Sequence, residues 1–303
     1  DFGKATLEAT KIEAVNRIQN MEKKEGFMAG AAEADRIFGK PHLWLKAKLV
    51  GLLQPMEGGR ASFDALEKSL LGKYYGGMHS ELEEGKLWSF LNNKENEIFI
   101  ARELAEVTKV KGNVGLTGKP EAAKIAGIIE KYRLMSMAEE NRHGAFVRPL
   151  QGYIARNSHN ASKVRRAQFE GWRDDIYEFG DMNAILKNVS EENADSFLKA
   201  IWADLAAGRH LIPVGEKESD ALFAFDGPGN LAKRESSHRV IHFKDADAWY
   251  AYNQKYGNDG LIESIIVEFR RASRNTALMS IFGTNPRAMY DTVLRDLKVL
   301  YRD

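Results

Sequence analysis

The chain has 303 residues, of which 44% are hydrophobic and 29% are charged, and this composition is ordinary for a folded globular protein rather than a disordered one. Its 44 Lys and Arg residues nearly balance its 43 Asp and Glu residues. That balance excludes a global field that would draw the whole chain to nucleic acid or to an anionic membrane. Because cysteine is absent, disulfides, thiolate zinc sites and cysteine nucleophiles are also excluded.

No apolar run approaches the roughly 20 residues that span a bilayer, so the sequence predicts no membrane-spanning segment. The chain opens with Asp1 rather than Met, and it lacks the basic-then-apolar pattern of a signal peptide. We therefore expect a processed product or a piece of a longer polypeptide.

Helical patterns dominate the first part of the chain. Leu7, Ala14, Val15 and Ile18 fall at helical spacing with charged residues between them. Gly and Pro interrupt this pattern at 39–41, 54–59 and 76–77. Further helices are expected over 62–67 and 98–110. The loop 111–120 is the clearest break. We therefore expect a helical N-terminal region, 1–115, followed by a second region, 116–303.

The second region begins with a helix over 119–132, in which Pro120 suits the first turn. The expected buried face of this helix is formed by Ala123, Ile125, Ile128, Ile129 and Tyr132. Helices are also predicted over 169–177 and 190–207, the latter capped by Ser190.

The pattern then changes from helical to strand-like, since 209–214 and 239–243 have the composition of short strands. After Asp245 helices resume, with breaks at 257–260 and 283–286. The predicted fold is therefore mainly α, a multi-helix assembly with at most one small β-hairpin.

Two histidines and an aspartate, His238, His242 and Asp245, are the candidates for acid/base or metal chemistry. Histidines four apart can share a metal on a helix. However, Arg239, Val240 and Phe243 favour a strand, on which the two histidines would lie roughly 13 Å apart. Arg239 also occupies the position where a helical zinc site has a glutamate. The sequence thus predicts no metal, no cofactor and no defined catalytic residue.

The same stretch has a structural interpretation that accounts for more of its residues. Asp245 or Asp247 can cap the next helix. Trp249, Tyr252 and Tyr256 lie at i, i+3 and i+7, which is one helical stripe that would pack on the core.

Basic residues cluster within 142–166 and interleave with aromatic ones, which is a pattern that can hold a phosphate backbone. The alternative is a solvated face, or an interface that pairs with acidic residues. On a later helix two arginines share one face and could pair with Glu263 or with a neighbouring subunit. The candidates for nucleic-acid or partner binding are Arg148, Arg156, Lys163, Arg165, Arg166, Arg270 and Arg274.

Residues of about 130–297 resemble a module of the large internal or minor virion proteins of tailed bacteriophages and prophages. The matching segments occur in order at 146–153, 157–160, 163–173, 197–208, 238–253, 256–257, 271–278 and 282–286. The segment 238–253, which reads HRVIHFKDADAWYAYN, is the most distinctive of them. The resemblance implies a protein carried in the virion and, for some members, ejected with the genome. It defines no catalytic residue for this chain.

Three hypotheses follow. The leading one is a non-enzymatic structural segment of an internal virion or ejection protein, which assembles with other virion chains as a homo- or hetero-oligomer. In that case it would be located inside the capsid or tail channel, would be delivered into the bacterial host, and could contact phage DNA. The second is an enzyme that acts on nucleic acid or cell wall around residues 238–247. The third is a nucleic-acid-binding module that uses the basic 142–166 segment.

Overall fold

The computed structural model describes residues 2–50, 62–107, 116–145, 159–187, 189–208 and 240–301, together with Val147, Pro149, Gly152 and Ile154. The fold of this described part is mainly α, as the sequence predicts. The helices up to residue 107 are α1 Phe2–Phe38, α2 His42–Val50, α3 Phe63–Leu71, the π-helix η1 Gly72–Gly76, α4 Gly77–Glu84, α5 Trp88–Leu91, η2 Lys94–Asn96 and α6 Glu97–Val107. Those after it are α7 Pro120–Arg142, α8 Ala161–Phe179, α9 Met182–Ile185, η3 Glu191–Asn193, α10 Ala194–Ala206, α12 Ala246–Tyr256, α13 Leu261–Phe282 and α14 Pro286–Leu300.

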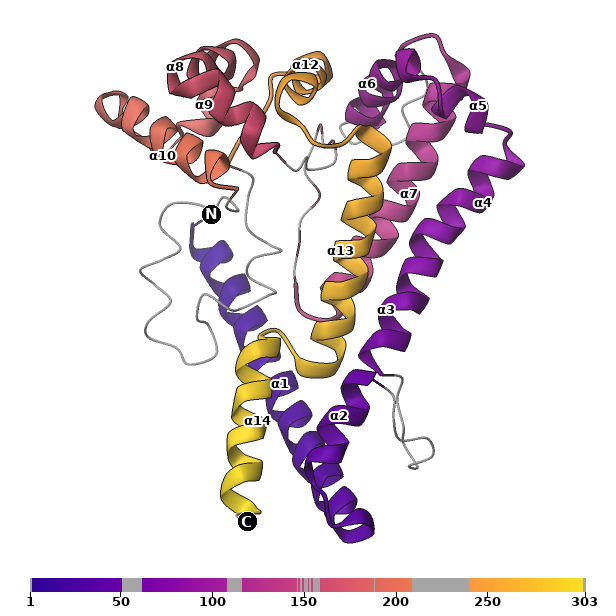
Figure 1. Cartoon of the computed structure of the whole chain (residues 1–303), viewed down its shortest axis with the longest axis vertical. Coiled ribbons are helices and arrows are strands. Elements are labelled where there is room, and N and C mark those ends of the chain that lie inside the picture. Colours follow the sequence, from indigo (N-terminus) through magenta and orange to yellow (C-terminus); the bar gives the residue numbers. More distant parts are fainter. Residues whose placement is uncertain are drawn as a thin grey trace.

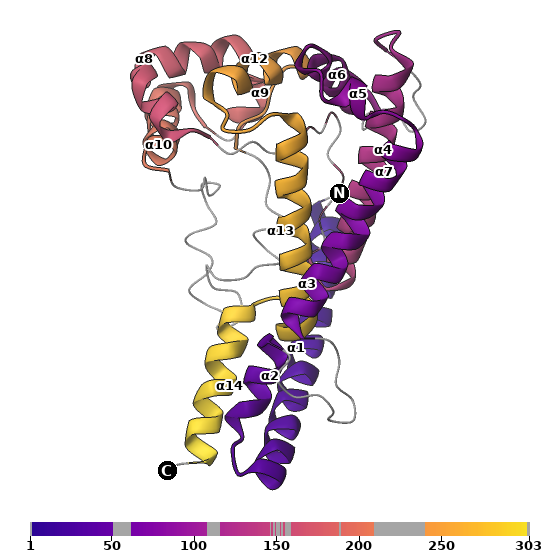
Figure 2. The ribbon, with the colours of Figure 1, turned by 45° about the vertical axis from the view of Figure 1, so that its right-hand side comes forward.

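The helices form a broad head above a narrower stalk (Figure 1). Helices α4–α7 lie on one side of the head, and α8, α9, α10 and α12 lie on the other. The stalk contains α1, α2 and α14. Helix α13 runs from the head down to the stalk, and the view in Figure 2 shows the same division.

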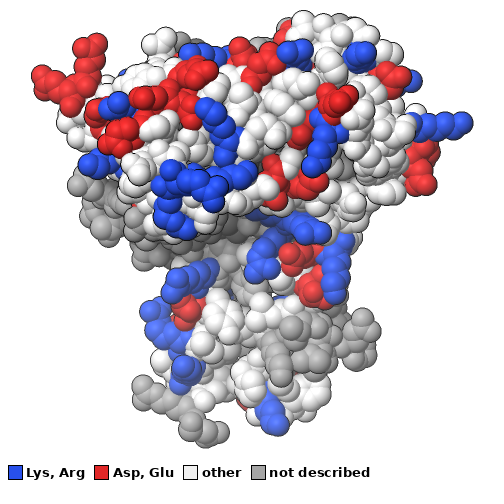
Figure 3. Space-filling view, turned by 45° about the horizontal axis from the view of Figure 1, so that its top comes forward, with Lys and Arg blue, Asp and Glu red and all other residues white. Residues whose placement is uncertain are grey.

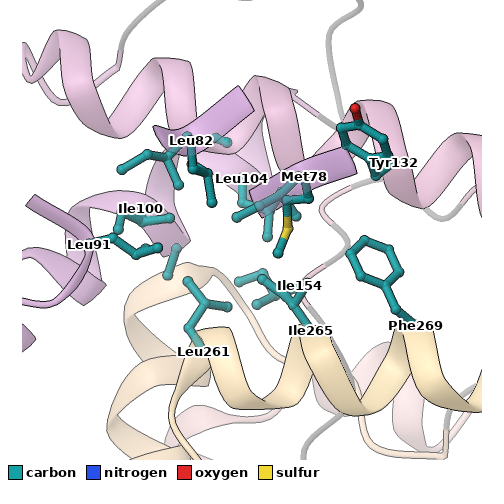
Figure 4. Packing of buried hydrophobic residues seen from close by; sticks show 14 of the residues in the cluster. Met78, Leu82, Leu91, Ile100, Leu104, Tyr132, Ile154, Leu261, Ile265 and Phe269 are labelled. Carbon is teal, nitrogen blue, oxygen red and sulfur yellow. The ribbon is translucent and has the colours of Figure 1, made fainter. Parts of the chain in front are cut away.

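The largest hydrophobic cluster, here called the central cluster, fills the head between α4, α6, α7 and α13. Figure 4 shows Leu261, Ile265 and Phe269 of α13 pointing toward Met78 and the neighbouring leucines. Tyr74, Met78, Leu82, Ile125 and Leu261 are each fully buried in this cluster. Burial of such side chains stabilises the folded state by about 1.5–3 kcal/mol each before conformational entropy is counted.

A second cluster, the α8–α12 cluster, fills the other side of the head. Its buried members are Val164, Trp172, Ile176, Ile185, Leu198, Ile201, Leu205, Ala206, Ile241, Tyr252 and Tyr256. Helix α12 belongs to both clusters, because Trp249 packs in the central cluster while Tyr252 and Tyr256 pack in the second. This helix therefore joins the two sides of the head.

A third cluster, the α1–α14 cluster, holds the stalk together. Phe27 of α1 stacks on Phe282 at the end of α13, with ring centroids 5.3 Å apart. Met289, Val293 and Leu297 lie at helical spacing on α14 and are buried against α1.

Local signals explain most helix ends. The Ser62 side chain accepts a hydrogen bond from the Ala65 amide at the start of α3, Pro120 opens α7, and Gly257 follows α12. The predicted breaks at 39–41, 257–260 and 283–286 are confirmed, but the one at 76–77 is wrong, because η1 continues directly into α4 with helical backbone angles at Gly76 and Gly77. Ser190 precedes η3 but makes no side-chain bond to the helix backbone, and its Oγ accepts from the Asn193 amide group instead.

Strand 209–214 of the predicted hairpin lies outside the described residues, as does Arg239. From 240 to 243 the chain forms no strand, and Phe243 makes one isolated bridge with Gly180. The expected boundary near residue 115 falls between α6 and α7, whose buried side chains share the central cluster. That 1–115 and 116–303 are separate units stays a prediction.

Within the described residues, no helix combines the length and the apolar character needed to cross a bilayer.

Candidate functional site on α12

The stretch singled out for acid/base chemistry lies at the entry to α12. His238 is outside the described residues. Asp245 caps the helix, since its Oδ1 accepts a hydrogen bond from the Ala248 amide at 2.8 Å. His242 is half-buried, and its carbonyl oxygen accepts from the Asp181 amide at 2.9 Å. Of the two aspartates proposed as caps, Asp245 is the one used.

A pocket of about 320 Å³ opens beside the first turn of α12. Asp245 and Asp247 line it together with Arg102, whose guanidinium pairs with the Asp247 carboxylate at 2.8 Å. His242 is not among the lining residues, so this pocket does not bring His242 and Asp245 together. Among the described residues, no group of three or more His, Asp and Glu side chains is arranged to hold a metal.

The aromatic stripe of α12 is buried, as predicted. Trp249, Tyr252 and Tyr256 are 2%, 1% and 4% exposed. Tyr252 also contacts Phe243 and Tyr256, with ring centroids 5.0 and 4.9 Å apart. The stripe therefore contributes packing to both sides of the head.

The buried Tyr252 hydroxyl lies between two hydrogen-bond partners, Trp172, which is buried, and His159, which is half-buried. The Trp172 Nε1–H donates to the Tyr252 hydroxyl at 2.9 Å, and this hydroxyl lies 3.1 Å from His159 Nε2. Since the hydroxyl has one proton and already accepts from Trp172, we assign it as the donor to His159 Nε2. This assignment places the histidine proton on Nδ1 and keeps the ring neutral.

Burial governs the protonation of His159 and Tyr252. Desolvation lowers the pKa of His159 to about 4. Desolvation also raises the pKa of Tyr252 well above its ordinary value, although the hydrogen bond from Trp172 acts in the opposite direction. At neutral pH both side chains are uncharged, which suits a structural role in an apolar cluster.

We expect His159 to make the stability of the fold dependent on pH. The folded-state pKa of about 4 lies below the ordinary value of 6.5, so between these values the unfolded chain binds more protons. The free energy of unfolding therefore falls as pH is lowered through this window, by on the order of 1 kcal/mol per pH unit. Urea unfolding of the wild type and of His159→Gln from pH 8 to 4.5 measures the difference. Parallel pH profiles for the two proteins would contradict this assignment.

Tyr256, one turn beyond Tyr252, links α12 to α8 through Asp175. The Tyr256 hydroxyl donates to Asp175 Oδ2 at 2.5 Å, and Lys255 Nζ lies 2.6 Å from Oδ1. Burial, together with the hydrogen bond to Asp175, raises the pKa of Tyr256. The carboxylate therefore has two partners from one helix and fixes the contact between α8 and α12.

Two of the predicted binding residues cap the ends of helices. Lys163 Nζ donates to the Gly257 carbonyl at 2.9 Å, just after α12, and Arg165 Nη1 donates to the Ala206 carbonyl at 2.5 Å, at the end of α10. Lys244 acts in the same way at the end of α8, with its Nζ 2.6 Å from the Glu178 carbonyl oxygen. Cations stabilise helix C-termini because the last carbonyls lack partners and carry partial negative charge.

We expect Lys163→Met to lower the free energy of unfolding by about 1 kcal/mol, because it keeps the apolar stem and removes the hydrogen bond to the end of α12. Arg166→Met is the matched control, since Arg166 is exposed on the same helix. For this control we expect a change within about 0.5 kcal/mol. Guanidinium unfolding curves of the two variants compare them directly, and equal effects would contradict the capping role.

The remaining binding candidates are dispersed. Arg148 and Arg156 lie outside the described residues, and Arg270 is exposed on α13. Arg274 lies 3.7 Å from Glu67 of α3, rather than pairing with Glu263, and its guanidinium stands 5.3 Å from the centre of the Phe63 ring. On the face of the head shown in Figure 3, basic and acidic side chains are interspersed.

A second polar constellation, here called the α1–α13 joint, was not predicted. Asn20 Nδ2 donates to Thr284 Oγ1 at 2.9 Å, and its Oδ1 accepts from the Thr284 amide at 3.1 Å. Lys23 Nζ donates to the Ser280 carbonyl near the end of α13 at 2.7 Å. Asn20 and Thr284 are 7% and 3% exposed. The break at 283–286 was the available sequence signal, but its partner on α1 is more than 250 residues away.

Comparisons of this chain with protein-family models, with curated proteins and with solved structures found no match.

Proposed function

We propose that this chain is a non-enzymatic structural segment of an internal virion protein of a tailed bacteriophage, and that it works by assembling with other virion chains. The supporting observation is where the segments that resemble this family lie. They supply Trp172, Leu198, Trp249 and Tyr252, which are buried packing residues of the head. The resemblance thus coincides with residues that build the fold.

The residues that suggested chemistry have structural contacts that fit this proposal. The Asp245 carboxylate is a helix cap, and Lys163 and Arg165 bind helix ends. Trp172 and Tyr252 are buried, His159 is half-buried, and both His159 and Tyr252 are uncharged at neutral pH. Each group contributes to packing or capping, as expected for a segment whose role is assembly.

Location inside the capsid or tail channel, followed by delivery into the host, is part of the same proposal. Contact with phage DNA stays a prediction. Among the described candidates for such contact, the exposed ones are Arg165, Arg166, Arg270 and Arg274, although Arg165, like Lys163, donates to a backbone carbonyl.

The proposal is tested by supplying an affinity-tagged copy of the chain during infection and separating particles on a density gradient. We expect the tagged chain to sediment with intact particles. A tagged Trp172→Ala chain, whose packing is disrupted, should remain with free protein. A wild-type chain that is expressed and folded but never sediments with particles would overturn the proposal.

A further inference from the structure

Exposed apolar side chains are concentrated in the stalk. Val15, Ile18 and Met21 of α1 are 46%, 54% and 56% exposed, and Val299 and Leu300 at the end of α14 are 57% and 65% exposed. The opposite face of α1, with Asn20, Phe27, Ala31 and Ala34, is buried. Helix α1 therefore carries three exposed apolar side chains, with charged residues such as Glu22 and Glu25 among them, on a side that does not pack within the described residues. Exposed apolar patches of this kind mark interaction surfaces.

Part of this face is continuous with α14. Helices α1 and α14 lie side by side in the stalk (Figures 1 and 2), and Lys24 Nζ pairs with the Asp296 carboxylate at 2.8 Å. A groove of about 320 Å³ lies between them, lined by Met28, Arg295, Asp296, Val299 and Leu300. Met21 and Met28 are seven residues apart and share one side of α1, and Ile18 is one turn before Met21. We call Ile18, Met21, Met28, Val299 and Leu300 the α1–α14 edge.

Each helix carries charges of both signs near the edge, including exposed Arg17 on α1 and exposed Asp291 on α14, but two charged pairs have opposite signs on the two helices. Exposed Glu22 and Glu25 flank it on α1, whereas exposed Arg295 and Lys298 flank it on α14. Glu22 and Glu25 are three residues apart, as are Arg295 and Lys298. If two edges meet antiparallel about a two-fold axis, α1 of one copy lies along α14 of the other. Glu25 then faces Arg295 and Glu22 faces Lys298, with both pairs in register.

We propose that the α1–α14 edge pairs with the same edge of a second copy of this chain in a two-fold symmetric dimer. An isologous interface requires one surface to be complementary to itself, and this edge combines an apolar centre with one acidic pair on α1 and one basic pair on α14. The apolar centre supplies the affinity, and the charge pairs fix the antiparallel orientation. The proposed dimer rests on the proposed function only in that it supplies one partner, a second copy of the chain, for the assembly role.

Sedimentation equilibrium of the purified chain over a range of concentrations tests the pairing. We expect a reversible dimer of the 34.1-kDa chain. Met21→Glu and Leu300→Glu should each raise the dimer dissociation constant at least about tenfold. Val267→Glu is the matched control, because Val267 is 47% exposed on α13 in the head and should leave the constant within about twofold. Far-UV circular dichroism verifies that each variant is folded.

Charge reversal tests the orientation. Glu25→Arg and Arg295→Glu should each weaken the dimer, since each places like charges together, and the double variant should recover most of the loss. A chain that stays monomeric at every concentration overturns the pairing, as does a dimer that the edge variants leave unchanged. A monomer that instead binds a different virion chain through Met21 and Leu300 also overturns it. None of these results changes whether the chain is found in particles, so the two proposals fail separately.

Discussion

Trp172→Ala is expected to lower the free energy of unfolding by about 3–5 kcal/mol, as is typical of deleting a buried tryptophan. Trp172 is fully buried in the α8–α12 cluster, and its Nε1–H is the donor to the Tyr252 hydroxyl. The substitution leaves a cavity and removes one of the two partners of that hydroxyl. Chemical denaturation followed by far-UV circular dichroism measures the change.

Two further variants separate packing from hydrogen bonding at this position. Trp172→Phe keeps an aromatic ring and loses the N–H donor, and we expect a loss of about 1–2 kcal/mol. Tyr177→Ala, on the same helix and 45% exposed, should change stability by less than about 0.5 kcal/mol. If Trp172→Ala were no more destabilising than Tyr177→Ala, the α8–α12 cluster could not be the core of this side of the head.

Gly283→Ala is expected to be the most damaging substitution in the α1–α13 joint, with a loss of at least about 3 kcal/mol. Gly283 has φ +81° and ψ −171°, a region that is essentially restricted to glycine. A Cβ at this position would lie 2.1 Å from Asn20 Oδ1. Backbone strain of about 1–3 kcal/mol therefore adds to the loss of the hydrogen bonds between Asn20 and Thr284. Thermal and urea unfolding both report the change.

The control for this substitution is Gly127→Ala on α7. Gly127 is helical and exposed, and a Cβ there would meet no atom within 4 Å. It should raise stability by about 0.5–1 kcal/mol, because alanine is the better helix former. Asn20→Ala in the Gly283→Ala background should recover about 1 kcal/mol by removing the steric clash. If the changes in the free energy of unfolding from Gly283→Ala and Asn20→Ala simply added in the double variant, the contact between Gly283 and Asn20 would be contradicted.

Local features of this fold could be predicted from the sequence. The helix over 119–132, the capping role assigned to Asp245 or Asp247 and the burial of Trp249, Tyr252 and Tyr256 all depend on spacing within a few residues. Such patterns are set by the period of the helix and by the unpaired amides of its first turn. The mainly α fold class follows from the same signals.

Contacts distant in sequence could not be predicted. In the sequence, Lys163 and Arg165 look like part of a basic surface. Only the packing of α12 and α10 against α8 shows that they bind helix ends. Val15 and Ile18 fit a helical stripe, yet they are exposed because the opposite face of α1, with Phe27 and Ala31, packs on α13 and α14. The pairing of Asn20 with Thr284 depends on the whole path of the chain between them.

The most direct test of the assembly role is quantitative mass spectrometry of purified phage particles before and after their DNA is released in vitro. We expect peptides from this chain, at more than one copy per particle, in the full particles, and a lower amount in the emptied ones. A chain that is abundant in infected cells but absent from full particles would contradict the proposal that it is carried in the virion.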